Sequence, residues 1–199
     1  MSKIITDIDQ LDLKASYTYA DYLLWQFQER VELIKGKIFK MSPAPSRKHQ
    51  DISRTIMREI DSFFLKKQFK LYFAPFDVRL IHFKKSTADN HIISVVQPDL
   101  CVICDESKLD SKGCIGAPDL IIEIVSSGNS KKEMDIKFDL YEENGVREYW
   151  IVNPTDEAIY IYVLQNGKFI GQKPLTTDNK LHSPTFENLS FDVKNIFDF

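Results

Sequence analysis

Hydrophobic residues recur at three- and four-residue steps over residues 47–67, a spacing that predicts a long helix with one buried face. The stripe consists of Ile52, Ile56, Ile60 and Phe63, and His49 begins it. Ser130 and Glu133 form the capping box of a second predicted helix, which Gly145 ends. These two helices are the main helical elements that the pattern predicts, besides a short first helix over residues 18–26.

Apolar runs of strand length fill most of the remaining chain. They cover residues 30–34, 37–41, 69–80, 95–104, 120–125, 148–152, 158–164 and 168–172. Lys35-Gly36 and Asn166-Gly167 predict tight hairpin turns, and Pro75 predicts a bend. The run over 120–125 is nearly continuous, which is typical of a strand buried on both faces in the middle of a sheet. The alternation of strands and helices predicts an α/β (α+β) fold with a mixed central β-sheet flanked by helices; the region 105–116 is expected to be a connection, and the tail over 183–199 shows no clear period.

Length and composition narrow the class of protein. A chain of 199 residues fits one domain spanning residues 1–199. With 26 Lys and Arg against 29 Asp and Glu, the net charge of −3 excludes the strongly basic surface of an indiscriminate nucleic-acid binder. No apolar run approaches the roughly 18 residues of a membrane helix. Three cysteines cannot all pair within the chain and suit a reducing compartment. We therefore expect a cytoplasmic protein without membrane contact.

Cys101 and Cys104 form a CxxC motif within a predicted strand. Residues three apart on a strand point to opposite faces, and the sequence contains no second CxxC to complete a zinc site. We interpret both cysteines as structural.

Glu123 interrupts the apolar run over 120–125. A carboxylate in a doubly buried strand is costly unless a cation or a set of donors meets it. Asp99 stands at the head of another apolar run, 24 residues earlier, a separation that allows two strands and a loop to place the two side chains together. Two close carboxylates repel each other and favour a divalent cation such as Mg²⁺ between them.

Lys137 lies on the apolar stripe of the second predicted helix, with Met134, Phe138 and Tyr141. Lysines at such positions often extend along the surface until the ammonium reaches water. The alternative is that Lys137 reaches the two acidic residues on the neighbouring strands.

The sequence around these residues resembles that of a known family. Pro98-Asp99, followed by the sequence Ala-Pro-Asp-Leu-Ile-Ile-Glu-Ile-Val-Ser over residues 117–126, resembles the restriction-endonuclease-like PD-(D/E)XK superfamily. More narrowly, the chain is similar to the Uma-two family of restriction-endonuclease-like proteins over residues 17–164. The narrower match rests on Glu32 to Gly36, Ser42-Pro43 with His49, Asp135-Ile136-Lys137, and the run Gly145-Val146-Arg147-Glu148-Tyr149-Trp150. The superfamily places a lysine two residues after the acid, where this chain has Val125, and the resemblance implies that Lys137 replaces it.

The resemblance implies a restriction-endonuclease-like core and a metal-dependent endonuclease acting on nucleic acid, most simply DNA. Asp99 and Glu123 would hold Mg²⁺ or Mn²⁺, and Lys137 would orient the attacking water or offset charge on phosphorus. Glu32 would bind a metal-bound water, and His49 would contact phosphate or move a proton. Two simpler interpretations stay open, in which Glu32 is a surface acid of a hairpin and His49 a half-buried helix residue. Asp119 is a reserve candidate on the same strand face as Glu123.

Two other functions compete with the endonuclease. The charge of −3 and Val125 in the lysine position favour a catalytically silent module of the same fold that binds nucleic acid or protein. A hydrolase of small phosphodiesters would use the same metal site. The resemblance also suggests a homodimer, whose interface Tyr160, Tyr162 and Phe169 would supply unless they cover the core.

Overall fold

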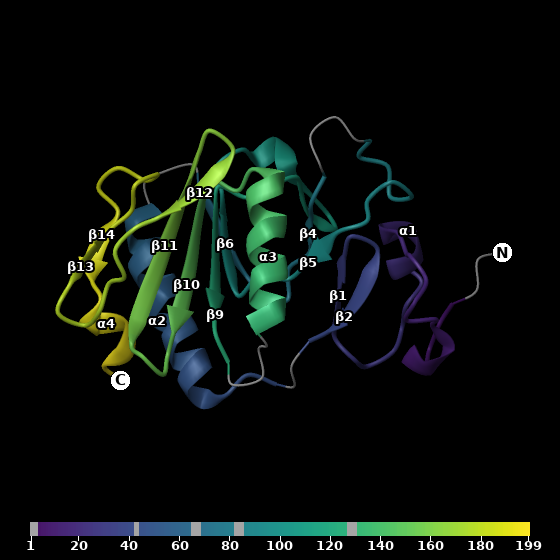
Figure 1. The fold of residues 1–199 in the computed structure, drawn as a ribbon, viewed down its shortest axis with the longest axis horizontal. Helices are drawn as coiled ribbons and strands as arrows, with labels where there is room; N and C mark the ends of the chain where they lie inside the picture. The colour runs from purple at the N-terminus through teal and green to yellow at the C-terminus, as the bar shows by residue number, and fades with distance from the viewer. Residues whose placement is uncertain (1–3, 42–43, 65–68, 82–85, 127–130) are drawn as a thin grey trace.

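The computed structural model describes residues 4–41, 44–64, 69–81, 86–126 and 131–199, and in this part of the chain two six-stranded sheets stand beside each other (Figure 1). The first, here called the central sheet, has the strand order β12-β11-β10-β9-β6-β3. Its strands are β3 (Lys70–Phe73), β6 (Leu100–Ile103), β9 (Leu120–Ile124), β10 (Glu148–Asn153), β11 (Ala158–Gln165) and β12 (Lys168–Gly171). Strand β9 pairs parallel with β10 and antiparallel with β6, so the sheet is mixed, as predicted.

The second sheet has the order β2-β1-β5-β4-β8-β7 and was not predicted. Its strands are β1 (Val31–Ile34), β2 (Lys37–Lys40), β4 (Val78–Arg79), β5 (Val95–Val96), β7 (Leu109–Asp110) and β8 (Gly113–Ile115). The predicted hairpin is present, since Lys35 and Gly36 have φ of 50° and 79° in the turn between β1 and β2. The Asn166-Gly167 turn likewise joins β11 to β12.

Two predicted strands each divide between the sheets. The run over 95–104 is not one strand, because Pro98 lacks the N–H that a continuous ladder requires and the chain leaves the second sheet as β5 to enter the central sheet as β6. The run over 69–80 divides into β3 and β4 at the cis Ala74–Pro75 bond, where a bend was predicted. The expected connection over 105–116 contains the short helix η2 (Glu106–Lys108), β7 and β8.

Helices cover both faces of the central sheet (Figure 1). α3 (Lys131–Asn144) lies on one face, and α2 (Arg47–Phe64) lies on the other with the C-terminal elements β13 (Lys180–His182), β14 (Ser190–Asp192) and α4 (Lys194–Phe197). The end of the predicted helix over 47–67 and the cap residue Ser130 fall outside the described residues. No helix within the described ranges is both long and apolar enough to cross a membrane.

The first helix is shorter than predicted. α1 (Tyr19–Tyr22) follows the short helix η1 (Ile8–Gln10) and begins with a capping box between Thr18 and Asp21. It ends early because the backbone of Ile5 accepts the N–H of Gln26 (2.7 Å) and donates to Leu24 (2.9 Å), which holds the following residues extended.

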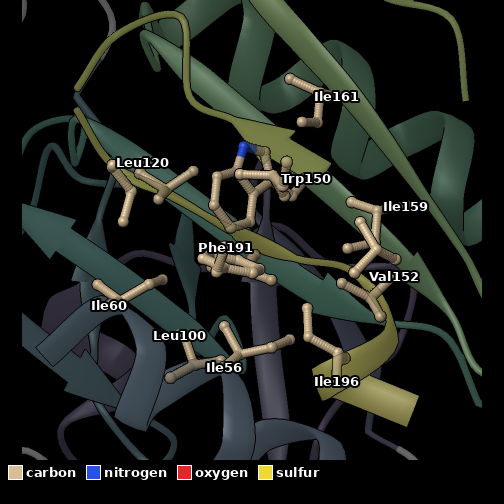
Figure 2. Close-up of a cluster of buried hydrophobic side chains, with 14 of the residues drawn as sticks. Ile56, Ile60, Leu100, Leu120, Trp150, Val152, Ile159, Ile161, Phe191 and Ile196 are labelled. Carbon is tan, nitrogen blue, oxygen red and sulfur yellow. The ribbon is translucent and has the colours of Figure 1, made fainter. Parts of the chain in front are cut away.

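Strand β9 lies between β10 and β6 in the central sheet, and both of its faces are buried. Leu120, Ile122 and Ile124 point toward α2, in the cluster around Trp150 that Figure 2 shows, while Ile121 packs on the α3 side. Phe191 and Ile196 from the tail close this cluster. The period of two therefore turns the side chain of Glu123 toward α3. The same alternation places Cys101 and Cys104 against opposite clusters, as predicted, and Cys101, Cys104 and Cys114 are free thiols.

Glu148 is a buried carboxylate that ties the C-terminal segment to the central sheet. Its side chain is fully inaccessible and accepts hydrogen bonds from Trp150 Nε1 (2.6 Å), Ser183 Oγ (2.8 Å) and the Thr185 N–H (2.9 Å). Charge-assisted bonds of this kind satisfy a buried carboxylate.

We predict that Glu148→Ala lowers the free energy of unfolding by about 2–4 kcal/mol, because it leaves buried donors without an acceptor. Urea denaturation measures this loss. The control is Glu187→Ala, which removes an exposed carboxylate of the C-terminal segment that Glu148 holds. It should change the free energy of unfolding by less than about 0.5 kcal/mol. Equal stability of the two variants would show that the Glu148 network contributes nothing.

Candidate active site

The five predicted site residues line one cavity of about 520 Å³ at the end of β9. They come from five places in the chain: Glu32 from β1, His49 from α2, Asp99 from the segment before β6, Glu123 from β9 and Lys137 from α3. The pairing of Leu100 with Ile122 places the beginning of β6 beside the end of β9. The two acids are therefore neighbours, as the sequence spacing predicted.

Asp99 is fixed through its Oδ2 atom. This oxygen accepts the Ile124 N–H at 2.7 Å and lies 3.2 Å from His49 Nε2. The hydroxyl of Ser46 accepts the His49 N–H and so fixes the first turn of α2. Burial lowers the pKa of His49, but the hydrogen bond and the negative charge of Asp99 outweigh burial and raise it overall.

Lys137 lies between two carboxylates. Its Nζ atom is 3.0 Å from Glu32 Oε1 and 3.0 Å from Glu123 Oε1, and its side chain is only 10% exposed. The lysine does not extend outward to solvent. Glu32 is also not a surface acid: it is buried, and its Oε1 accepts the Gln97 N–H at 2.8 Å.

Tyr141 belongs to the site although its sequence context did not predict it. Its buried hydroxyl donates to Glu123 Oε1 at 2.6 Å, the same oxygen that Lys137 contacts. Tyr141 stands four residues after Lys137 on α3, so both side chains leave the helix on one face. That spacing was visible in the sequence, but an aromatic residue on an apolar stripe is fully explained by packing.

Burial and the charges of neighbouring groups together set the pKa values of Glu123 and Lys137. Burial raises the pKa of Glu123, Lys137 opposes the rise, and the charges of Asp99 and Glu32 add to it. Burial lowers the pKa of Lys137, but Glu123 and Glu32 outweigh burial and raise it above its ordinary value. Lys137 is therefore an ammonium at neutral pH.

Asp119 does not belong to this group. Its Oδ1 pairs with Arg147 at 2.9 Å and its Oδ2 accepts the Cys104 N–H at 2.9 Å, so it closes the opposite end of β9. Asp119 and Glu123 are four residues apart, so their side chains share one face of the sheet but lie at opposite ends of β9. The reserve candidate has a structural role.

The donor set fits a hard divalent cation. Hydrogen bonds to each acid converge on one oxygen, Oδ2 of Asp99 and Oε1 of Glu123, and the second oxygens take none within the described chain. Glu32, Asp99 and Glu123 set three carboxyl groups against the one ammonium of Lys137, and the raised pKa of Glu123 reflects burial first and then repulsion from Asp99 and Glu32, which a further cation would relieve. In the ranges that the structure describes, no three His, Cys, Asp or Glu side chains form a ligand cluster. A two-carboxylate site suits Mg²⁺, which keeps waters and uses phosphate oxygens for its other positions.

The family model for Uma2, described as "Putative restriction endonuclease", matches residues 19–194. The chain belongs to the Uma2 family. This Uma2 protein is also similar to a crystal structure from Anabaena variabilis ATCC 29413, described as a "putative nuclease belonging to DUF820", with a TM-score of 0.67 and 21% identity over 91% of this chain and 97% of that one. At that identity the likeness shows a shared fold. No curated protein matches the chain.

The position of Lys137 predicts strong coupling with Glu32. In a double-mutant cycle of Lys137→Met and Glu32→Gln, measured by urea unfolding, we expect a coupling energy of about 1–3 kcal/mol, because the two charges are buried against each other.

The matched control is the exposed pair of Lys35 and Glu143, which are 2.9 Å apart with side chains 54% and 34% exposed. Solvent screening limits such a pair to about 0.2–1 kcal/mol. A coupling for Lys137 no larger than that of the control would contradict a buried ion pair.

Proposed function

We propose that this Uma2 protein is a metal-dependent endonuclease that hydrolyses DNA phosphodiester bonds. The observation that carries the proposal is the meeting of Asp99, Glu123 and Lys137 in one open cavity. Family membership supports the reaction class, and the second oxygens of the two acids support the metal.

Asp99 and Glu123 are the residues that would hold Mg²⁺ or Mn²⁺. When bound there, the ion supplies a Lewis acid for a phosphate oxygen and makes a water easier to deprotonate. The two carboxylates are already fixed in place, each through one of its two oxygens. The Ile124 N–H holds Oδ2 of Asp99, and Tyr141 and Lys137 hold Oε1 of Glu123. Such preorganisation avoids a reorganisation cost during the reaction.

Lys137 acts as a permanent cation. Because Glu123 and Glu32 raise its pKa, it retains its proton and cannot serve as the base that takes a proton from water. It instead donates hydrogen bonds that orient the attacking water or offset charge on the pentacovalent phosphorus. This arrangement supports the substitution of Lys137 for the lysine that the superfamily places at the position of Val125.

Glu32 and His49 receive positioning roles. Both oxygens of Glu32 lie 3.0 Å from Lys137 Nζ, which favours holding the lysine over binding a metal-bound water. His49 approaches Asp99 through Nε2, while its Nδ1 is buried and has no hydrogen-bond partner within the described residues. A buried Nδ1 is poorly placed for phosphate, so we assign His49 to fixing Asp99.

The homodimer that the family resemblance suggests stays a prediction. Of the three aromatic residues considered for its interface, Phe169 is buried, and Tyr160 and Tyr162 pack against the same core cluster. These residues therefore cover the core.

The endonuclease proposal predicts that wild-type protein cleaves DNA with Mg²⁺ or Mn²⁺ and not with a chelator. Glu123→Ala should reduce cleavage to background, and Lys137→Ala should lower the rate at least about a hundredfold, because a donor at the developing charge is lost. Gel analysis of a labelled randomised DNA pool measures both.

The controls for this assay are Asp139→Ala and Lys132→Ala, exposed charges on the same helix, which should cleave at the wild-type rate. Full activity of Glu123→Ala would overturn the proposal. Salt-sensitive DNA binding without any metal-dependent cleavage would favour the catalytically silent module, and turnover of simple phosphodiesters without DNA cleavage would favour the small-molecule hydrolase.

Metal binding is predicted independently of catalysis. In calorimetric titration with Mn²⁺, Asp99→Asn and Glu123→Gln should each weaken binding at least about tenfold, because a neutral amide replaces an anionic ligand. Glu187→Gln is the exposed control and should bind as wild type does. Unchanged affinity in both site variants would exclude the two-carboxylate site.

A further inference from the structure

A second cavity adjoins the candidate active site. Its volume is about 310 Å³, and its lining includes Tyr22, Trp25 and Phe27. Arg30 and Gln97 line both this cavity and the active-site cavity, so the two cavities are neighbours on either side of these residues. The second cavity contains no part of the metal site, and neither the family description nor the proposed reaction explains it.

The three aromatic rings form a fixed wall. The rings of Trp25 and Phe27 are stacked with centroids 5.8 Å apart, and Tyr22 packs against Trp25 at 5.4 Å. The backbone of Trp25 forms a bridge with Ile5, and the Tyr22 hydroxyl lies 3.4 Å from the carbonyl oxygen of Val31 in β1. Each of the three residues remains partly accessible. The wall therefore lines the cavity with aromatic side chains that are packed against one another.

Polar side chains connect this wall to the catalytic group. The exposed guanidinium of Arg30 donates to Gln97 Oε1 at 2.9 Å, and the Gln97 N–H donates to Glu32, which holds Lys137. A phosphate bound at the junction would meet the positive charge of Arg30. From the second cavity toward the candidate active site, the aromatic wall is thus followed by Arg30 and then by the group around Lys137.

We propose that the aromatic cavity holds an unpaired nucleobase of the strand that is cleaved. The inference rests on the proposed function only in that a nucleic-acid strand must lie in the neighbouring cavity. Bases stack on aromatic side chains whatever their identity, while arginine binds the linking phosphate. A paired base inside a duplex has both faces covered and cannot enter such a cavity unless it is extruded. The preferred substrate is therefore single-stranded DNA, or a duplex with an unpaired nucleotide beside the cleaved bond.

Binding to four oligonucleotides tests this inference. The Glu123→Gln protein, in Mg²⁺ at a concentration that saturates its weakened metal site, is titrated with a single strand, its perfect duplex, a duplex with one unpaired nucleotide, and the same duplex with an abasic site there. The single strand and the unpaired nucleotide should bind roughly 5- to 150-fold more tightly than the perfect and abasic duplexes, the factor expected for one base–aromatic stack of about 1–3 kcal/mol. A 2-aminopurine at the unpaired position should lose fluorescence on binding.

Variants then locate the effect. Phe27→Ala and Trp25→Ala, made in the same Glu123→Gln protein, should remove both the preference and the fluorescence loss. Ile170→Ala is the matched control, since it removes an exposed apolar side chain, 50% accessible, from β12 and should retain both. Because Trp25 also packs against Tyr17, circular dichroism and melting verify that each variant is folded, and Phe27→Ala decides where Trp25→Ala fails to fold.

The outcomes separate this inference from the nuclease proposal. Equal binding of the four oligonucleotides, or a preference that survives Phe27→Ala, would overturn the base pocket even if wild-type protein cleaves DNA. A preference that depends on Phe27, in a protein that cleaves nothing, would support the pocket and overturn the nuclease.

Discussion

The ammonium of Lys137 holds the two sheets and α3 together at one point. Glu32 belongs to the second sheet, Glu123 to the central sheet and Lys137 to α3, and each contact measures 3.0 Å. Charges buried this deeply are tolerated only when they are paired, so none of the three elements can move away without leaving an uncompensated charge. In Figure 1, α3 lies between the labelled strands β9 and β10 of the central sheet on its left and the β1–β2 hairpin on its right. The ion pairs therefore fix the geometry of the cavity as well as its charge.

The same cavity depends on a break in a strand. Between β5 and β6 the chain passes from one sheet to the other through Gln97, Pro98 and Asp99. The interruption frees the Gln97 N–H from any ladder and lets it bind Glu32, while Asp99 enters the central sheet beside Ile124. A continuous strand would pair the backbone there and turn alternate side chains away from each other. The strand break thus lets the Gln97 N–H hold Glu32 and lets the Asp99 side chain lie beside Glu123.

The grouping of the candidate site residues was more predictable than the architecture around them. Glu123 and Lys137 were recognisable because a charge in an apolar pattern requires a partner, and Asp99 because its spacing allows adjacent strands. The second sheet was not predictable from the sequence. Its strands β4 and β5 are only two residues long and are held by pairing with distant segments, so they show no periodicity. Tyr141 and Gln97 were missed for a related reason: a tyrosine on an apolar stripe and a backbone N–H carry no unusual signal in a sequence.

The charge of the cavity bears on how a polyanion enters it. Asp99 and Glu123 place acidic groups side by side in this cavity, and their negative charge opposes the approach of a phosphate in a partly buried site. Under the proposed function, a divalent cation held by Asp99 and Glu123 would offset this charge and present positive charge to the substrate. Binding of the cation and binding of the nucleic acid would then strengthen each other by the same factor, since coupling free energies are reciprocal. Under the proposed function, the metal would supply the attraction for phosphate within the site itself, which is compatible with a net charge of −3.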